Sequence, residues 1–149
     1  MSTINKAACI GGGVIGAGWV ARLVLNGIDV SIFDPDPEAE RKVNAVMKNA
    51  RAAYRQMTPS LPKEGRITYA KTLAEAVKDA DLIQESVPER LDIKHKVLAE
   101  IDAHAKSDAL IGSSTSGIKP SDMQTSMTRP ARLVVAHPFN PVYLLTIVE

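Results

Sequence analysis

Short apolar runs alternate with longer stretches of helical periodicity along almost the whole chain of 149 residues. The apolar runs predict strands at residues 7–10, 30–33, 67–69, 82–87, 109–111 and 133–136. The stretches between them predict helices at residues 14–25, 37–54, 72–80, 91–105 and 120–127. Because strands joined by helical crossovers run parallel, we predict an α/β fold with a doubly wound, mostly parallel sheet and helices on both faces.

A last apolar run at residues 144–148 predicts one more strand, which we expect to pair antiparallel at the edge of the sheet. No internal repeat, low-complexity tract or linker divides the chain, so residues 1–149 are expected to form one domain. Because the chain stops within an apolar run, we expect a longer protein to contain it.

The composition argues against several classes of function. The chain has 18 Lys and Arg against 17 Asp and Glu, and therefore lacks the basic excess typical of nucleic-acid and membrane-surface binding. The single cysteine, Cys9, lies in an apolar run and is expected to be a buried thiol, and no Cys/His spacing predicts a metal site. The sequence shows neither a membrane span nor a signal peptide, so we expect a cytoplasmic protein.

A glycine-rich turn follows the first predicted strand and opens the first predicted helix. It has the pattern G-x-G-x-x-G, in the residues Gly11, Gly12, Gly13, Val14, Ile15 and Gly16. In this context the pattern predicts the dinucleotide-binding turn of a Rossmann-type fold. Gly11 would make the tight turn, Gly13 would let the pyrophosphate approach the backbone, and Gly16 would let helix and strand pack closely. The N–H groups at the start of the helix would bind the phosphates.

Asp34 ends the second predicted strand, where the fold places an acid that accepts hydrogen bonds from the ribose hydroxyls of adenosine. A carboxylate there repels the 2′-phosphate of NADP. Asp36 and Glu38 follow closely and no arginine does, which strengthens this preference. We therefore predict that residues 1–149 form an NAD-binding domain; the alternative is that Asp34 only caps the loop.

Two polar segments follow the last two predicted parallel strands. Residues 113–117 read Ser-Ser-Thr-Ser-Gly, and residues 137–141 read His-Pro-Phe-Asn-Pro. Since the carboxyl ends of strands border the ligand crevice in an open α/β sheet, both segments are expected to face the nicotinamide. Together with the glycine turn and Val-Pro-Glu-Arg-Leu at residues 87–91, they resemble the L-3-hydroxyacyl-CoA dehydrogenase family over essentially the whole chain.

This resemblance implies an NAD-dependent oxidoreductase and assigns roles to three catalytic residues. His137 would be the base that takes the hydroxyl proton from a small hydroxy-acid substrate. Glu149 would be the carboxylate that orients the imidazole and stabilises its protonated form. Ser116 would form a hydrogen bond with the substrate oxygen. The alternative for His137 is a structural histidine at a strand end.

The resemblance also implies three further contacts with the cofactor. Asn140 would lie near the nicotinamide, and Glu89 and Lys94 would line the cofactor and substrate side of the crevice. For Lys94 the sequence leaves an equal alternative, because a lysine between Arg90 and Lys96 could simply face solvent on its helix.

Within the family, residues 84–94 and 137–145 are most similar to the branch that oxidises L-carnitine to 3-dehydrocarnitine, although Thr146 and Ile147 replace the usual Pro-Leu of that branch. A second possibility is a 3-hydroxyacyl-CoA dehydrogenase, including the 3-hydroxybutyryl-CoA type. A third is a non-enzymatic, crystallin-like NAD-binding protein. The stretch at residues 56–65 is short and broken by proline, and it offers little to a CoA phosphate.

The family also has a helical C-terminal domain, which supplies a second active-site asparagine and most of a dimer interface. The resemblance implies that the full-length protein is a homodimer. No part of this chain matches the domain that carries most of the interface. Residues 1–149 alone are expected to bind NAD and to turn over substrate at a negligible rate. A carnitine site also needs aromatic walls for its trimethylammonium group, for which Tyr143 is a candidate, whereas Trp19 is expected in the core.

Overall fold

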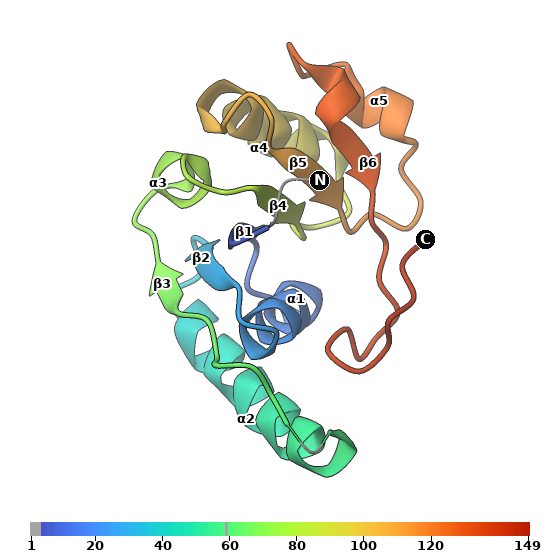
Figure 1. The fold of residues 1–149 in the computed structure, drawn as a ribbon. Coiled ribbons are helices and arrows are strands. Elements are labelled where there is room, and N and C mark those ends of the chain that lie inside the picture. The colour runs from blue at the N-terminus through green and yellow to red at the C-terminus, as the bar shows by residue number, and fades with distance from the viewer. Residues whose placement is uncertain (1–3, 59) are drawn as a thin grey trace.

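The computed structural model describes residues 4–58 and 60–149, and these form one six-stranded sheet between two layers of helices (Figure 1). The strand order is β3-β2-β1-β4-β5-β6, and all neighbours pair in parallel. The strands are β1 (Lys6–Ile10), β2 (Asp29–Phe33), β3 (Ile67–Tyr69), β4 (Leu82–Glu85), β5 (Leu110–Ser113) and β6 (Leu133–Val135). The predicted doubly wound Rossmann-type fold is confirmed.

The helices cover the two faces of the sheet. On one side lie α1 (Val14–Leu25) and α2 (Ala39–Met57), and on the other lie α3 (Leu73–Val77), α4 (Leu91–His104) and α5 (Pro120–Gln124) (Figure 1). The buried positions of α2, Val43, Met47 and Ala50, are spaced along one stripe of the helix, and α2 packs through it against α1. Each layer buries its own apolar cluster against the sheet.

The strand order reverses at β1. The chain moves outward from β1 to β2 and β3, and then returns to pair β4 with the other side of β1. Crossovers that leave in opposite directions open a crevice between the carboxyl ends of β1 and β4, where open α/β sheets bind their ligands. The predicted site residues follow the strands at this edge.

Some predicted boundaries differ from the structure. The second helix begins at Ala39 rather than Pro37, because Asp36 first forms a turn by accepting N–H bonds from Glu38 and Ala39. In the loop after this helix, Pro59 lies outside the described residues. The predicted capping box before α3 is confirmed: the Glu75 N–H donates to Thr72 Oγ1 over 3.1 Å.

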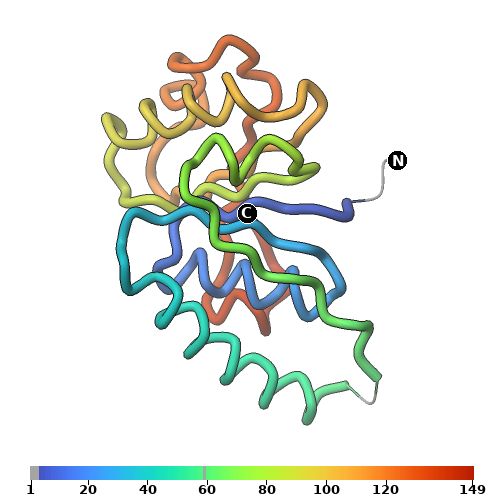
Figure 2. The backbone as a smooth tube through the Cα atoms, turned by 90° about the vertical axis from the view of Figure 1, so that its left-hand side faces the viewer, coloured from blue at the N-terminus to red at the C-terminus, as the bar shows by residue number. Residues whose placement is uncertain are grey.

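The predicted strand at residues 144–148 is not a strand of the sheet. Its antiparallel direction is seen only in one isolated bridge, between Pro138 and Val148. The segment after β6 instead turns back beside α1, as the ribbon and the backbone tube show (Figures 1 and 2). Val142 is buried against Gly18, where a Cβ would lie 2.8 Å from the valine Cβ. This packing leaves too little chain to extend the sheet.

Two expectations from the composition concern burial. Cys9 is fully buried in β1, and burial raises the pKa of its thiol to about 12, so the thiol is unreactive near neutral pH. Trp19 lies in the core as predicted. Within residues 4–58 and 60–149, no helix is long and apolar enough to cross a membrane.

Candidate active site

The glycine turn has the backbone geometry that the pattern predicts. Gly11 follows β1 with a φ of +99°, a backbone conformation that residues other than glycine rarely adopt. A Cβ at Gly11 would also lie 2.6 Å from the Ser86 carbonyl oxygen, and a Cβ at Gly16 would overlap the Gly11 carbonyl. Both positions therefore require glycine, because α1 starts in direct contact with the end of β1.

The N-terminus of α1 is open to a ligand. No described side chain caps it, and its first turn holds no acidic residue. A Cβ at Gly13 would have no described atom within 4 Å, and Val14 is 68% exposed. The first N–H groups of a helix lack intrahelical partners, and the helix dipole is positive at this end. Gly13, Val14 and Ile15 therefore offer a cradle that fits the pyrophosphate of a dinucleotide.

Asp34 lies beside this cradle and joins the ends of β1 and β2. Its Oδ2 accepts the Gly12 N–H over 2.5 Å, and its Oδ1 accepts the Asp36 N–H over 2.8 Å. The carboxylate therefore caps the loop, which was the alternative role for Asp34. It also lines the adjacent cavity, and each oxygen keeps capacity for a further hydrogen bond. The two readings are compatible.

The cavity beside Asp34 has a volume of about 570 Å³. It lies between the carboxyl ends of β1, β2 and β4 and the first turns of α4, and most of its wall is apolar. The lining residues are Ile10, Gly11, Gly13, Phe33, Asp34, Pro35, Ser86, Val87, Pro88, Ile93 and Val97. An apolar slot with one carboxylate at its rim fits an adenosine: the walls suit the adenine, and Asp34 suits the ribose hydroxyls.

The position of Asp34 leads to a cofactor-selectivity prediction. We expect NAD to bind more tightly than NADP, by a factor on the order of 10², because a 2′-phosphate would face the carboxylate at close range. Asp34→Ala should narrow this gap, with Asp108→Ala, an exposed carboxylate before β5 at the opposite edge of the sheet, as a matched control. Calorimetric titration with both cofactors measures the two affinities. Equal or tighter binding of NADP to the unaltered protein would contradict the assignment.

Glu89 follows β4 and organises the turn after β5. Its Oε1 accepts hydrogen bonds from Thr115 Oγ1 over 2.5 Å and from the N–H groups of Ser116 and Gly117 over 3.0 Å each. Burial alone would raise the pKa of this carboxyl, but these hydrogen bonds and the nearby charge of Lys94 outweigh it and lower the pKa. Glu89 is therefore ionised at neutral pH and fixes the backbone that presents Ser116.

Lys94 is buried, so the solvated alternative for this residue is wrong. Its side chain is 1% exposed, and its Nζ lies 2.8 and 2.9 Å from the two carboxylate oxygens of Glu85, which is 0% exposed. Glu89 Oε2 is 3.5 Å away on the other side. Lys94 does not line the cavity beside Asp34. Its observed partners are carboxylates of the protein, and contact with the cofactor stays a prediction.

His137 and Glu149 lie opposite each other although twelve positions separate them in sequence. The His137 N–H donates to the Glu149 carbonyl, and the Glu149 N–H donates to the His137 carbonyl, each over 2.9 Å. Residues that exchange both bonds in an antiparallel pair carry their side chains on the same face. As a result, His137 Nδ1 lies 3.4 Å from Glu149 Oε2. A carboxylate only accepts, so a hydrogen bond within this pair is one that Nδ1 donates to Glu149.

Ser116 and Asn140 are both exposed at the same edge of the sheet as this pair. Ser116 follows β5 and Asn140 follows β6, and these strands are neighbours in the register Ser113 to Val135. The structure therefore brings the predicted catalytic segments to adjacent strand ends. No group of His, Cys, Asp and Glu side chains in the described ranges could hold a metal ion.

The sequence reasoning missed Arg22, which holds the segment that carries His137 and Glu149. From the last turn of α1, its Nη1 donates to the carbonyls of Val142 over 3.1 Å and Leu145 over 2.8 Å. The sequence signal that could have identified Arg22 is a single charged residue in an otherwise apolar helix. The buried polar residues Gln84 and Glu85 were also missed, because both were assigned only to a strand.

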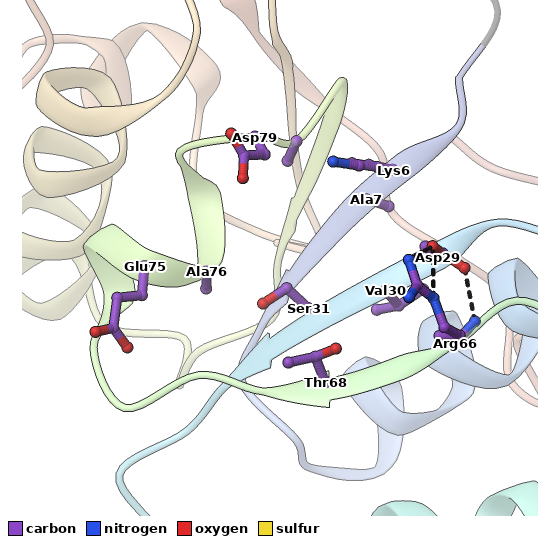
Figure 3. A pocket seen from close by; sticks show the side chains of 11 residues that line it. Lys6, Ala7, Asp29, Val30, Ser31, Arg66, Thr68, Glu75, Ala76 and Asp79 are labelled. Atoms are coloured by element: carbon purple, nitrogen blue, oxygen red, sulfur yellow. Dashed lines mark hydrogen bonds and ion pairs between the residues drawn. The ribbon is translucent and has the colours of Figure 1, made fainter.

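A second cavity, of about 230 Å³, lies away from this site (Figure 3). It is bordered by Lys6 and Asp29, which begin β1 and β2, and by Arg66 and Asp79, which precede β3 and β4. These are the amino ends of the strands, opposite to the edge that carries the glycine turn. Arg66 and Asp29 pair with each other in its wall over 2.8 Å. Because the cavity lies at the edge of the sheet opposite to the candidate site, we assign it no part in catalysis.

Comparison with known proteins agrees with this geometry. The family described as 3-hydroxyacyl-CoA dehydrogenase, NAD binding domain, matches residues 6–149. An L-carnitine dehydrogenase of Mesorhizobium japonicum is 77% identical over 100% of this chain and 42% of its own length. A Rhizobium L-carnitine dehydrogenase/betainyl-CoA thioesterase is 61% identical over 100% of this chain and 30% of its own length. The chain thus spans less than half of these curated relatives.

Among solved structures, FHMPC 5-dehydrogenase, an NAD+ dependent dismutase, superposes with a TM-score of 0.89 at 32% sequence identity. The superposition covers 99% of this chain and 48% of that enzyme. The family match, the glycine cradle and the cavity beside Asp34 agree on NAD as the cofactor. This chain belongs to the family of NAD-binding domains of 3-hydroxyacyl-CoA dehydrogenases.

Proposed function

We propose that the protein containing this domain oxidises the 3-hydroxyl group of L-carnitine to the ketone of 3-dehydrocarnitine, with NAD as the oxidant. The observation that carries the proposal is the His137–Glu149 pair, which lies at the same carboxyl edge of the sheet as the glycine cradle. The substrate is inferred from the names of relatives, since the Mesorhizobium japonicum protein is named L-carnitine dehydrogenase and is 77% identical.

His137 acts as the general base in this proposal. The chemistry that NAD would supply when bound is that of an acceptor for the hydride, the hydrogen with its electron pair, from the carbinol carbon. Nε2 of His137 takes the hydroxyl proton at the same time, because Nδ1 is turned toward Glu149 Oε2 at 3.4 Å. The carboxylate holds the ring in the reactive tautomer and stabilises the imidazolium that forms, which then carries the proton until it exchanges with solvent.

Ser116 and Asn140 complete the reacting end of the site. Ser116 would donate a hydrogen bond to the substrate oxygen, which gains carbonyl character as the reaction proceeds. Its backbone is fixed for this by the 3.0 Å bond from its N–H to Glu89. Asn140 would hold the nicotinamide end, while Gly13, Asp34 and the apolar cavity hold the phosphates and the adenosine.

A 3-hydroxyacyl-CoA dehydrogenase is the second candidate, and the description of the matched family favours it. The loop between α2 and β3 argues against it. The loop is short and broken by proline, and its Glu64 pairs with the Arg51 guanidinium of α2 over 2.8 Å. A guanidinium that is already paired with a carboxylate attracts phosphate more weakly.

A substrate panel separates these candidates and also tests the non-enzymatic alternative. We expect the full-length protein to reduce NAD with L-carnitine and to leave D-carnitine and short L-3-hydroxyacyl-CoA thioesters nearly unreacted. The rate is followed by NADH absorbance, with His137→Gln as the inactive control. Faster reaction with a thioester would assign the protein to the second candidate, and no reaction with any of them would favour an NAD-binding protein without catalysis.

The proposal extends to partners and location. The relatives are more than twice as long as this chain, which supports a further domain that closes the crevice and supplies a dimer interface. Residues 1–149 alone would then bind NAD and turn over substrate at a negligible rate, because one wall of the site would be missing. We propose a homodimeric cytoplasmic enzyme with a small hydroxy-acid substrate.

A further inference from the structure

A buried glutamine connects the two halves of the candidate site. Gln84 lies in β4 and is 1% exposed. Its Nε2 donates one hydrogen bond to Ser114 Oγ over 2.8 Å and a second to the Ala136 carbonyl over 3.3 Å. The side chain thus crosses β5 and reaches the end of β6, directly before His137. An amide is rarely placed in a core unless its hydrogen bonds are needed there.

The neighbouring strand is shaped to admit this side chain. Gly112 of β5 lies under it, and a Cβ at that position would be 2.5 Å from Gln84 Oε1 and 3.0 Å from the Ala136 Cβ. Any larger residue at 112 would push the amide away from the end of β6. The position of the Gln84 amide therefore requires glycine at residue 112.

The hydrogen bonds continue from Gln84 to the cofactor cavity. Ser114 Oγ, which accepts from Gln84, lies 2.9 Å from Ser86 Oγ. Ser86 directly follows β4 and lines the cavity beside Asp34. A continuous chain of three hydrogen bonds therefore runs from Ser86, in the wall of the cavity beside Asp34, to the carbonyl of Ala136.

The peptide group between Ala136 and His137 is held at both ends by this arrangement. Its carbonyl accepts from Gln84, and its N–H donates to the Glu149 carbonyl over 2.9 Å. Fixing both ends fixes the plane of the peptide, and with it the direction in which the His137 side chain leaves the backbone.

We propose that Gln84 is a positioning residue for His137: through the Ala136 carbonyl and the Ser114–Ser86 pair, it sets the imidazole relative to the cofactor. This rests on the proposed function of His137 as the base. Hydride and proton must leave the same hydroxyl-bearing carbon and oxygen together, so the base and the nicotinamide need a fixed relative placement. A displacement of about 1 Å can lower turnover on the order of 10²-fold.

Gln124, the last residue of α5, provides a matched control at the other end of β6. Its Nε2 donates to the carbonyl of Pro130 over 3.0 Å, just before β6, and to the carbonyl of Leu133 over 3.1 Å, at the start of β6. Each glutamine makes two amide hydrogen bonds, at least one of them to a carbonyl at an end of β6, but only Gln84 does so beside His137. Loss of either should loosen the strand, whereas only loss of Gln84 should misplace the base.

The experiment compares three variants of the full-length protein with the unaltered one. Gln84→Met keeps the length of the side chain and removes both donors. We expect kcat with L-carnitine to fall about tenfold to a hundredfold, while KM for NAD stays within about twofold because Gln84 does not line the cavity. Ser114→Ala, which spares the bond to Ala136, should lower kcat less, and Gln124→Met should leave it unchanged within about twofold.

A spectroscopic readout separates positioning from general destabilisation and does not depend on turnover. With ¹⁵N-labelled histidine, we expect the neutral His137 ring to be in the Nδ1–H tautomer in the unaltered protein and in Gln124→Met. Gln84→Met should populate both tautomers, because the ring moves away from Glu149. If Gln84→Met does not fold, as thermal unfolding would show, Ser114→Ala decides by the same tautomer signal.

Three results would overturn the proposal: equal losses of kcat in Gln84→Met and Gln124→Met, an unchanged kcat in Gln84→Met, or an unchanged tautomer in the deciding variant. Failure of the proposed function looks different. In that case the unaltered protein would not oxidise L-carnitine, while the tautomer measurement would still report whether Gln84 orients His137.

Discussion

His137→Gln is expected to lower turnover of L-carnitine by a factor on the order of 10² to 10⁴, which is typical for the loss of a general base. Glutamine keeps a polar group at this position but takes no proton at neutral pH. The affinity for NAD should change little, because His137 does not line the cavity beside Asp34. Steady-state kinetics of NADH formation measure the first quantity, and calorimetric titration with NAD measures the second.

His95→Gln is the matched control for this substitution. His95 Nε2 contacts the Asp122 carbonyl over 2.8 Å, between α4 and α5, and has no place at the strand edge. The control should retain turnover within about twofold. If turnover in His137→Gln stays within a few-fold of the unaltered protein, His137 is not the base.

Lys94→Met is expected to destabilise the fold by about 3–5 kcal/mol, since removing one partner of a buried ion pair leaves an unpaired charge in the core. The charge left behind is Glu85, which is 0% exposed and otherwise held by the Val87 N–H and the Ser113 hydroxyl. For a domain of this size we expect the melting temperature to fall by roughly 10 °C, measured by thermal unfolding followed by circular dichroism.

Lys96→Met controls for loss of a positive charge, because Lys96 lies two positions away on the same helix and is exposed. It should change the melting temperature by no more than about 2 °C. The comparison distinguishes the two roles of Lys94. If Lys94→Met weakens NAD binding while the melting temperature stays unchanged, the lysine serves the cofactor and its pairing with Glu85 contributes little to stability.

Much of the fold followed from the sequence because local signals agreed with the global arrangement. The six parallel strands were each marked by an apolar run, and the crossovers by helical periodicity. The exception was the segment at residues 144–148. Its apolar residues satisfy the pattern of a strand, but the chain there packs across α1 through Val142 and Arg22, and tertiary contact overrides the local preference.

The candidate site divides into a part that local sequence could predict and a part that it could not. The glycine turn and Asp34 obey fixed spacings that arise from one turn and one strand end, and the structure places them around one cavity. The nearness of His137 and Glu149 depends on a chain reversal with a particular register, which resemblance implied and the residues alone did not. The burial of Lys94 depends on Glu85, nine positions earlier on another element.

The most direct test of the proposed oxidation uses L-carnitine with deuterium in place of the hydrogen on carbon 3. The full-length protein is incubated with this substrate and NAD, and the nicotinamide product is examined by mass spectrometry. We expect each molecule of reduced cofactor to carry one deuterium, because the hydrogen passes directly from carbon 3 to the nicotinamide ring. Formation of unlabelled NADH, or no reduction of NAD by L-carnitine, would contradict the proposal.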